Sequence, residues 1–351
     1  MSRTSYLTFC QPSVVKLPPL KLFFRKQKQL VPYTSEPIMR RLETIGRVCY
    51  QSADKITKDS HLSFVAKLVE RRHWSVLEHI HLLLCLPADE LRMLLDYQLQ
   101  HQLSAITCRH YDWLQAGAQA GTISCTYRHL LELLELTLVG VSKTNGFSAE
   151  PCNYLACRLY QLLTDTLQLP IPIELRQLAE TYGLRQSLIS PPASPTTLKY
   201  WHMLDIAEPC RCWKLLQPDP DYVTFKLVCD RGISHELVRH RFEFSFTQES
   251  TRYVDYSKTN VKVIGDPACQ SETMTNALAH AAKAYCELRE EGVTPQTARG
   301  VLPTAIATTI YVTASKRSWL SFLMQRCSPA AHPQMRQLAL QISGQLMRLC
   351  R

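Results

Sequence analysis

The sequence predicts an α+β fold rather than a regular βαβ array. Three observations lead to this prediction. The stretch YVTFKLVCD at 222–230 alternates in character and is rich in residues that favour strands. Leucines recur at intervals of three and four residues through much of 88–185, which is the spacing of a helix face. The other strand candidates are separated by irregular spans, whereas a βαβ array would alternate strands and helices evenly.

The N-terminal part contains two predicted helices and a strand. A helix is expected from about 36 to 50, because apolar residues such as Ile38 and Leu42 recur at helical spacing. A second helix is expected over about 61–72 for the same reason. The apolar run IHLLLCL follows the segment HWSVLEH, residues 73–79, and predicts a strand.

The rest of the chain continues this mixture. The segment 88–185 is predicted to be mainly helical, and the Pro/Ser-rich stretch SLISPPASPTT at 187–197 is predicted to be a loop. A long helix is expected over 272–291, followed by a strand around 306–313 with a short helix before it and a longer one after it. The last helix is expected to begin after Pro333.

Composition limits the class of protein. The 351 residues are 46% hydrophobic and 20% charged, as in an ordinary globular protein, and no run of about 18 apolar residues predicts a membrane span. Fourteen cysteines occur without a disulfide framework or a signal peptide, so reduced thiols and a cytoplasmic location are expected. The net charge of +10 favours anionic partners without choosing among them. Residues 1–30 are expected to be a basic, extended lead-in.

Several familiar chemistries are not indicated. In SHELVRH the two histidines are five residues apart, whereas the HExxH zinc helix needs four. The CRC triplet at 210–212 lacks a second ligand pair, so no metal is predicted. No nucleophile elbow, Walker loop or GxGxxG motif is present, which weakens hydrolase, NTPase and Rossmann interpretations.

The stretch RHRFEFSFTQESTRY, residues 239–253, concentrates arginines, hydroxyls and aromatic rings. If its backbone were extended, Arg239 and Arg241 would share one face with His240 on the other. Two guanidinium groups on one face suit a phosphate or pyrophosphate, and aromatic rings can flank a planar ring system. Composition alone leaves this open against a solvated, ion-paired strand.

Three blocks in order resemble the flavin-dependent thymidylate synthases, the ThyX family. RHRFEFSFTQESTRY resembles the family signature, although eight residues separate RHR from Ser250 where the usual pattern has seven. We expect a bulge near Phe242 to Phe244 to absorb the extra residue. HWSVLEH and ARGVLPTAIATTIYVTASKRSWLSFLMQR, residues 298–326, resemble two further family segments.

The resemblance implies a fold, a division of the chain and an assembly. The fold would be a mixed α+β domain with an antiparallel sheet and flanking helices, plus an inserted, mainly helical segment. Residues 31–80 and 222–351 would form the catalytic domain, with 81–221 inserted and 1–30 as the lead-in. Family members are homotetramers that hold FAD and dUMP side by side, so the same partners are expected here, with neither nucleic acid nor a membrane.

Site residues follow from matching positions. The positions that match FAD contacts are Ser75, Arg239, His240, Arg241, Gln248, Ser315, Arg317 and Ser321. The positions that match dUMP contacts are Glu236, Arg239, Glu249, Ser250, Thr251, Arg252 and Arg299. Arg326 stands where the family has the arginine that activates the uracil ring, a role suited to a planar cation that stays charged.

The resemblance implies reductive methylation of dUMP to dTMP with 5,10-methylenetetrahydrofolate and NADPH, by way of FAD. Ser315 and Ser321 stand where the family has asparagine-type residues and offer fewer hydrogen-bonding atoms. A ThyX-like protein that binds nucleotide or flavin with weakened or lost catalysis is therefore the first alternative. A nucleic-acid-binding protein is the second, because of the +10 charge.

Overall fold

The computed structural model describes residues 6–20, 25–26, 29–30, 35–100, 109–111, 120–143, 151–184, 214–219, 221–265 and 271–347. The chain divides into two compact units. Unit 1 comprises Met1–Pro19, Thr44–Ile56 and Asp221–Arg351, and unit 2 comprises Leu20–Glu43 and Thr57–Pro220. The domain division expected from the sequence follows family resemblance rather than compactness, and it stays a prediction.

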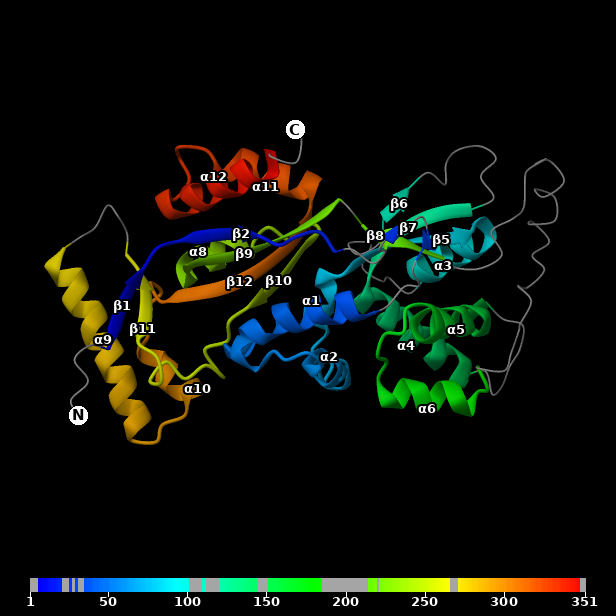
Figure 1. Cartoon of the computed structure of the whole chain (residues 1–351), viewed down its shortest axis with the longest axis horizontal. Helices are drawn as coiled ribbons and strands as arrows, with labels where there is room; N and C mark the ends of the chain where they lie inside the picture. The colour runs from blue at the N-terminus through cyan, green and yellow to red at the C-terminus, as the bar shows by residue number, and fades with distance from the viewer. Residues whose placement is uncertain are drawn as a thin grey trace. The chain divides into compact units, whose positions relative to one another are not determined.

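A four-stranded antiparallel sheet forms the centre of unit 1 (Figure 1). Its strands, in spatial order, are β10 (Phe244–Gln248), β12 (Ala307–Ser315), β9 (Tyr222–Asp230) and β2 (Ser13–Lys16). β9 and β12 pair along nine residues each and are largely buried, because two interior strands are covered on their faces. The predicted α+β class with an antiparallel sheet is confirmed.

Helices α11 (Lys316–Arg326) and α12 (Pro333–Met347) lie over one face of this sheet (Figure 1). Together with α8 (Arg231–Leu237) they share a core with the sheet. Trp319 is fully buried there, meets the ring of Phe225 edge-on at 5.1 Å, and donates from Nε1 to the carbonyl oxygen of Val223 at 3.1 Å. This contact fixes α11 on the sheet, which matters because α11 carries predicted site residues.

A second layer of unit 1 surrounds the long helix α9 (Glu272–Glu290). Strand β1 (Leu7–Cys10) pairs in parallel with β11 (Val261–Ile264), and both belong with α9 to one apolar cluster. The short elements of the unit are η1 (Arg47–Tyr50), η2 (Ala53–Lys55), α10 (Pro295–Ala298) and η6 (Arg299–Val301). Strands β1 and β2 of the basic lead-in are thus held in unit 1 by strand pairing.

Unit 2 has its own sheet, with the order β6 (Arg109–Tyr111), β7 (Ala120–Thr126), β5 (His81–Pro87) and β8 (Lys214–Pro218). Its helices are α2 (Ser60–Glu70), η3 (Trp74–His79), α3 (Ala88–Gln100), α4 (Tyr127–Lys143), α5 (Pro151–Gln161), η5 (Leu162–Thr166) and α6 (Ile173–Thr181). The two-residue strands β3 (Arg25–Lys26) and β4 (Gln29–Leu30) pair with each other. Helix α1 (Glu36–Gly46) begins in unit 2 and ends in unit 1.

Most of the predicted elements that fall on described residues are present, with one difference. Within 88–185, β6 and β7 are strands that the leucine pattern did not reveal, because both are short, and β7 pairs with β6 and with the distant β5. The predicted loop at 187–197 lies outside the described residues. Among the described helices, none combines the length and apolar character needed to cross a bilayer.

Candidate functional site

The triplet RHR forms a turn between α8 and β10 instead of the extended segment considered from sequence. Asp230 starts α8 by accepting from the backbone N–H of Ile233 at 2.6 Å. The turn then closes with a backbone hydrogen bond from His240 to the Leu237 carbonyl at 3.1 Å. The side chains of Arg239 and Arg241 are exposed, and among the described residues neither makes a side-chain hydrogen bond or an ion pair.

Arg326 joins the end of α11 to this turn. Its Nε donates to Nε2 of His240 at 3.0 Å, and its guanidinium pairs with Oε2 of Glu236 at 3.1 Å. Burial, helped by the nearby charge of Arg326, lowers the pKa of His240 from its ordinary value of 6.5. The imidazole is therefore neutral near pH 7, as it must be to accept a hydrogen bond at Nε2. Three predicted site residues thus meet.

The extra residue of the motif is absorbed in the turn rather than in the bulge that the sequence predicted. Strand β10 pairs with β12 residue for residue from Phe244 to Gln248, without a shift of register. Just before the strand, Glu243 has a φ of 58°. The left-handed backbone at Glu243 reverses the chain, and the Phe244 N–H donates to the Arg241 carbonyl at 3.4 Å.

Glu243 is buried and lies at the start of α11. Its Oε2 accepts from the hydroxyls of Ser315 and Ser318, the latter at 2.8 Å. Ser315 is also the N-cap of α11 and accepts from the Ser318 backbone N–H at 3.1 Å. Ser315 is fully buried, and its hydroxyl is hydrogen-bonded both to Glu243 and to the Ser318 backbone N–H. In this it differs from the two predicted flavin residues of α11. Arg317 and Ser321 are exposed instead.

Gln248 and Glu249 follow at the far end of β10. The side-chain amide of Gln248 donates to Ser234 Oγ at 2.8 Å and to Thr308 Oγ1 at 3.1 Å. Glu249 is buried and accepts from the Tyr256 hydroxyl at 2.5 Å. Burial raises the pKa of Tyr256, and the Glu249 carboxylate raises it further. Tyr256 is therefore a permanent donor that fixes the Glu249 carboxylate.

The next residues form a second group. Arg299 donates from Nη1 to Thr251 Oγ1 at 3.1 Å, while Arg252 donates from Nε to the side-chain oxygen of Gln296 at 2.9 Å. The Arg252 guanidinium also lies 5.5 Å from the centroid of the Tyr253 ring, and Ser250 accepts from the Arg252 backbone N–H at 3.3 Å. Both arginines are exposed. Among the predicted dUMP residues from 250 to 252, Thr251 therefore contacts Arg299.

Within the described residues, no hydrogen bond or ion pair joins this second group directly to Arg326. Helix α8 and strand β10 connect the two groups instead. Arg231 of α8 donates to the Glu249 carbonyl at 3.3 Å, Ser234 accepts from Gln248, and Glu236 holds Arg326. Helix α8 and strand β10 thus link the two groups of predicted site residues in unit 1.

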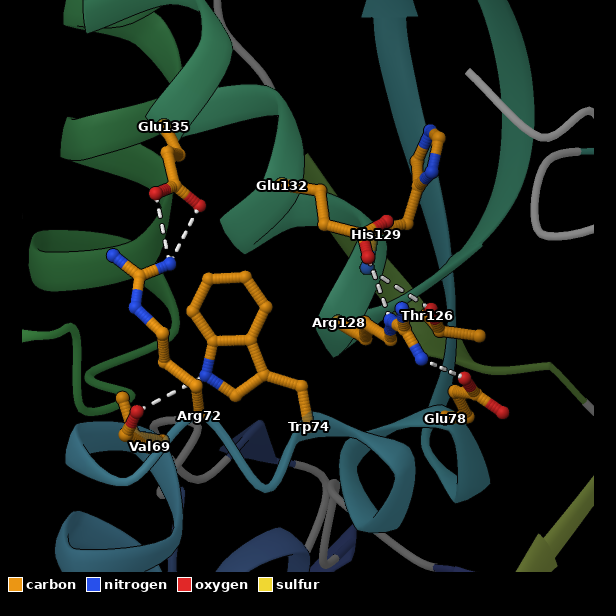
Figure 2. A network of polar contacts seen from close by, with 9 residues as sticks. All are labelled: Val69, Arg72, Trp74, Glu78, Thr126, Arg128, His129, Glu132 and Glu135. Carbon is orange, nitrogen blue, oxygen red and sulfur yellow. Dashed lines mark hydrogen bonds and ion pairs between the residues drawn. The ribbon is translucent and has the colours of Figure 1, made fainter.

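Ser75 lies on η3 in unit 2 and is exposed. Figure 2 shows that α4 holds this short helix through Arg128. The Arg128 guanidinium contacts Glu78 at 2.5 Å and Glu132 at 2.6 Å. Burial raises the pKa of the Glu78 carboxyl, and Arg128 opposes this shift. The segment HWSVLEH is therefore fixed by a helix from the predicted insertion.

The other end of η3 is also held (Figure 2). Trp74 is buried and donates from Nε1 to the Val69 carbonyl at 3.0 Å. Arg72 lies 5.2 Å from the Trp74 ring and donates to both carboxylate oxygens of Glu135 on α4, at 2.8 and 2.9 Å. Together with Arg128, this gives α4 two points of attachment to the segment around Ser75.

Sequence reasoning missed several residues that organise the site. Their contacts with predicted site residues arise only in the folded chain, and they are Ser234, Glu243, Tyr256, Gln296 and Ser318. A signal existed for one of them, because Glu243 is an acid in the stretch that holds the extra residue. Within the described residues, no cluster of His, Cys, Asp and Glu is placed to hold a metal ion, and the CRC triplet lies outside them.

Comparison with known proteins gives the family of this region. Residues 221–350, all within unit 1, match the family described as thymidylate synthase complementing protein, Thy1. The flavin-dependent thymidylate synthase of Mycolicibacterium gilvum is 34% identical over 137 residues, which is 33% of this chain and 54% of that protein. The Geobacter sulfurreducens enzyme is 35% identical over 117 residues, 32% of this chain and 50% of that protein.

The enzyme of Mycobacterium tuberculosis strain H37Rv is 35% identical over 136 residues, 33% of this chain and 53% of that protein. The chain thus spans about half the length of the curated relatives it matches. Among solved structures, a UMP/dUMP methylase, PolB from Streptomyces cacaoi, bound with 5-Br dUMP, matches with a TM-score of 0.32 and 23% identity, covering 36% of this chain and 67% of that one. Residues 221–350 are thus homologous to the Thy1/ThyX family and to the flavin-dependent thymidylate synthases.

Proposed function

We propose that the chain is a flavin-dependent thymidylate synthase. The reaction converts dUMP, 5,10-methylenetetrahydrofolate, NADPH and a proton into dTMP, tetrahydrofolate and NADP⁺. The observation that carries the proposal is the Arg326–Glu236–His240 group beside an RHR turn with two uncommitted arginines, within a segment that matches the family. The proposed protein is a cytoplasmic homotetramer, so neighbouring protomers complete each site.

The exposed arginines of the RHR turn and of α11 offer hydrogen-bond donors that fit an anionic cofactor. Arg239, Arg241 and Arg317 are exposed, and their guanidinium groups are without partners in the described part of the chain. Such groups bind phosphate and pyrophosphate through paired N–H donors. In the proposal they hold FAD, together with Ser75, His240, Gln248 and Ser321. FAD, when bound, supplies the redox chemistry that side chains lack.

Arg326 is the proposed catalytic residue. Glu236 and His240 hold its guanidinium on two sides, so it needs little reorganisation when charge develops on the N3/O4 edge of a uracil ring. One such preorganised contact contributes on the order of 3 kcal/mol, about a hundredfold in rate. In the proposal, the phosphate and sugar of dUMP are bound by Arg239, Ser250, Thr251, Arg252 and Arg299. The buried Glu249 orders the end of strand β10 through its hydrogen bond with Tyr256.

Tritium release from 5-labelled dUMP tests the proposal. The full chain, loaded with FAD and supplied with 5,10-methylenetetrahydrofolate and NADPH, is expected to release tritium and to form dTMP in equal amounts. Omission of any one component should stop both. Arg176→Ala is a matched control, because Arg176 is an exposed helix arginine in unit 2. A folded, flavin-loaded chain that releases no tritium contradicts the proposed activity.

A ThyX-like binding protein with weakened or lost catalysis is the second candidate, and Ser315 favours it. The hydroxyl of this predicted flavin residue is engaged by Glu243 and by the start of α11. It is therefore not available to a cofactor unless this contact opens. A purified chain that is colourless, yet binds dUMP in a calorimeter, supports this candidate. A yellow chain that turns over dUMP rejects it.

A further inference from the structure

Residues 240–244 lie along one face of α11. The His240 ring is 5.0 Å from the Phe322 ring, and the Phe244 ring is 5.1 Å from the Trp319 ring. At the two ends of the helix, Glu243 meets its first turn and His240 meets its last residue. The contacting positions of α11 follow each other at helical spacing and share one face, and they are Ser315, Ser318, Trp319, Phe322 and Arg326.

The Glu243 carboxylate is the polar contact at the first of these ends. It is 8% exposed, and its Oε2 accepts from two hydroxyls, Ser315 and Ser318. A carboxylate at a helix N-terminus is further stabilised by the unpaired N–H groups of the first turn. Because a buried carboxylate is costly without such donors, this contact selects one position of the turn relative to α11.

The backbone of Glu243 supports the same conclusion. Its φ of 58° is uncommon for a residue with a side chain, and glycine, asparagine or aspartate would adopt it more readily. A glutamate persists there only if its surroundings compensate for the backbone cost. The two serine hydroxyls provide that compensation.

We propose that Glu243 is a positioning residue, whose carboxylate fixes the RHR turn on α11 so that His240 and Arg241 face their ligand in one orientation. The mechanical part of the proposal stands on the contacts above, and the ligand part rests on the proposed function. Glu243 lies in the stretch that lengthens the motif, so the same stretch that departs from the usual spacing also supplies the contact that fixes the turn. Ser315 then acts on the turn from inside the protein, through its hydrogen bond to the Glu243 carboxylate.

Three variants separate the carboxylate from the backbone. Glu243→Gly removes the carboxylate and relieves the left-handed backbone, while Glu243→Gln keeps an acceptor oxygen. Ser318→Ala removes one donor from the opposite side. Gln168→Gly is the matched control, because Gln168 is exposed, has a φ of 49° and lies in unit 2.

Hydrogen–deuterium exchange of the full chain and titration with FAD are the two measurements. Glu243→Gly should raise exchange in peptides from 239–250 and from 315–326, and weaken FAD binding roughly tenfold, the effect of removing a buried charged acceptor. Glu243→Gln should stay within about threefold of wild type. Both changes break the same contact, between Glu243 and Ser318. The double variant Glu243→Gly with Ser318→Ala should therefore bind FAD no more weakly, and exchange no faster, than Glu243→Gly alone.

The outcomes are distinguishable. Unchanged exchange and unchanged FAD affinity in Glu243→Gly overturn the proposal, and so does a Gln168→Gly control with the same effect. If Glu243→Gly does not fold, Ser318→Ala carries the same two measurements. A wild-type chain that binds no FAD contradicts the proposed function and the ligand part. Exchange at 239–250 then decides the mechanical part by itself.

Discussion

The Nε atom of Arg326 donates to Nε2 of His240 at 3.0 Å, so the guanidinium and the imidazole act as a pair. Protonation of His240 would remove the acceptor and place two cations side by side. Burial and Arg326 both lower the pKa of His240 from 6.5, while Glu236 faces Arg326 rather than the ring. The pair is therefore stable at neutral pH and is lost only in acid.

This relationship predicts a pH dependence. Because the folded chain binds the His240 proton less readily than the unfolded chain, the contribution of the pair is complete above pH 6.5 and declines as the pH falls through the lowered pKa. We expect the acidic limb of the kcat/KM profile to lie below pH 6.5 and to disappear in His240→Gln. His280→Gln, at an exposed position, is the control and should keep the limb. An acidic limb that persists in His240→Gln would exclude this assignment.

Arg326 variants should lose catalysis without losing flavin. Arg326→Lys keeps a positive charge but cannot reproduce the planar fork that contacts Glu236 and His240 together. We expect kcat to fall about a hundredfold, while the FAD dissociation constant stays within roughly threefold. Steady-state kinetics and a flavin titration measure the two effects. A variant that loses flavin in proportion to kcat would assign Arg326 to binding instead.

The two unpartnered arginines of the turn give a different expectation. Arg239→Gln and Arg241→Gln remove no contact between described residues, so the free energy of unfolding should change by less than about 0.5 kcal/mol. Binding of FAD or dUMP should nevertheless weaken about tenfold, since each guanidinium supplies charged donors to a phosphate. Urea unfolding and ligand titration separate the two. If either variant instead unfolds much more easily, the arginine has a structural role.

The fold class and most long elements were predictable because their signals are local. The alternation in 222–230 and the apolar spacing in 272–291 depend only on neighbouring residues, and both became elements at nearly those bounds. Strand β7 was not predictable in this way, since the short segment AGTISCT carries no clear pattern of its own and is completed by pairing with β5 and β6. The contrast follows from whether a segment carries a pattern of its own, since β9 was predictable although its partner β12 is also distant in sequence.

The candidate site shows the same limit. The motif placed Arg326 and His240 in one site although 86 positions separate them. It did not reveal that Ser315 is turned inward, because that depends on the Glu243 carboxylate meeting the start of α11. It also placed the extra residue in a bulge, whereas a left-handed turn before the strand preserved the β10–β12 register.

The Arg128–Glu78 pair predicts how α4 supports the segment around Ser75. Arg128→Ala leaves the Glu78 carboxylate partly buried without this partner, so unfolding should become easier by about 1 kcal/mol. The double variant Arg128→Ala with Glu78→Gln should recover part of this loss, because the carboxylate then needs no counterion. Urea unfolding monitored by circular dichroism measures both. Equal stability of the single variant and wild type would show that the pair contributes nothing.

Two buried histidines predict that acid destabilises unit 2. Burial lowers the pKa of His129 to about 4, and burial with a smaller effect of Arg41 lowers that of His79 to about 3. Both values lie below the ordinary 6.5, so the unfolded chain binds more protons, and the free energy of unfolding must fall as the pH drops below 6.5. At pH 5 each histidine should account for a loss of roughly 2 kcal/mol relative to pH 7.

Urea titrations at pH 7, 6 and 5 measure this loss. His129→Gln removes one titrating group, so its unfolding free energy should depend less steeply on pH, by up to one proton per molecule between pH 6 and 5. His280→Gln, at an exposed position, is the control and should leave the slope unchanged. A His129→Gln slope equal to that of wild type would mean that His129 becomes protonated without unfolding. In that case the burial of His129 would not prevent its imidazole from becoming charged in the folded chain.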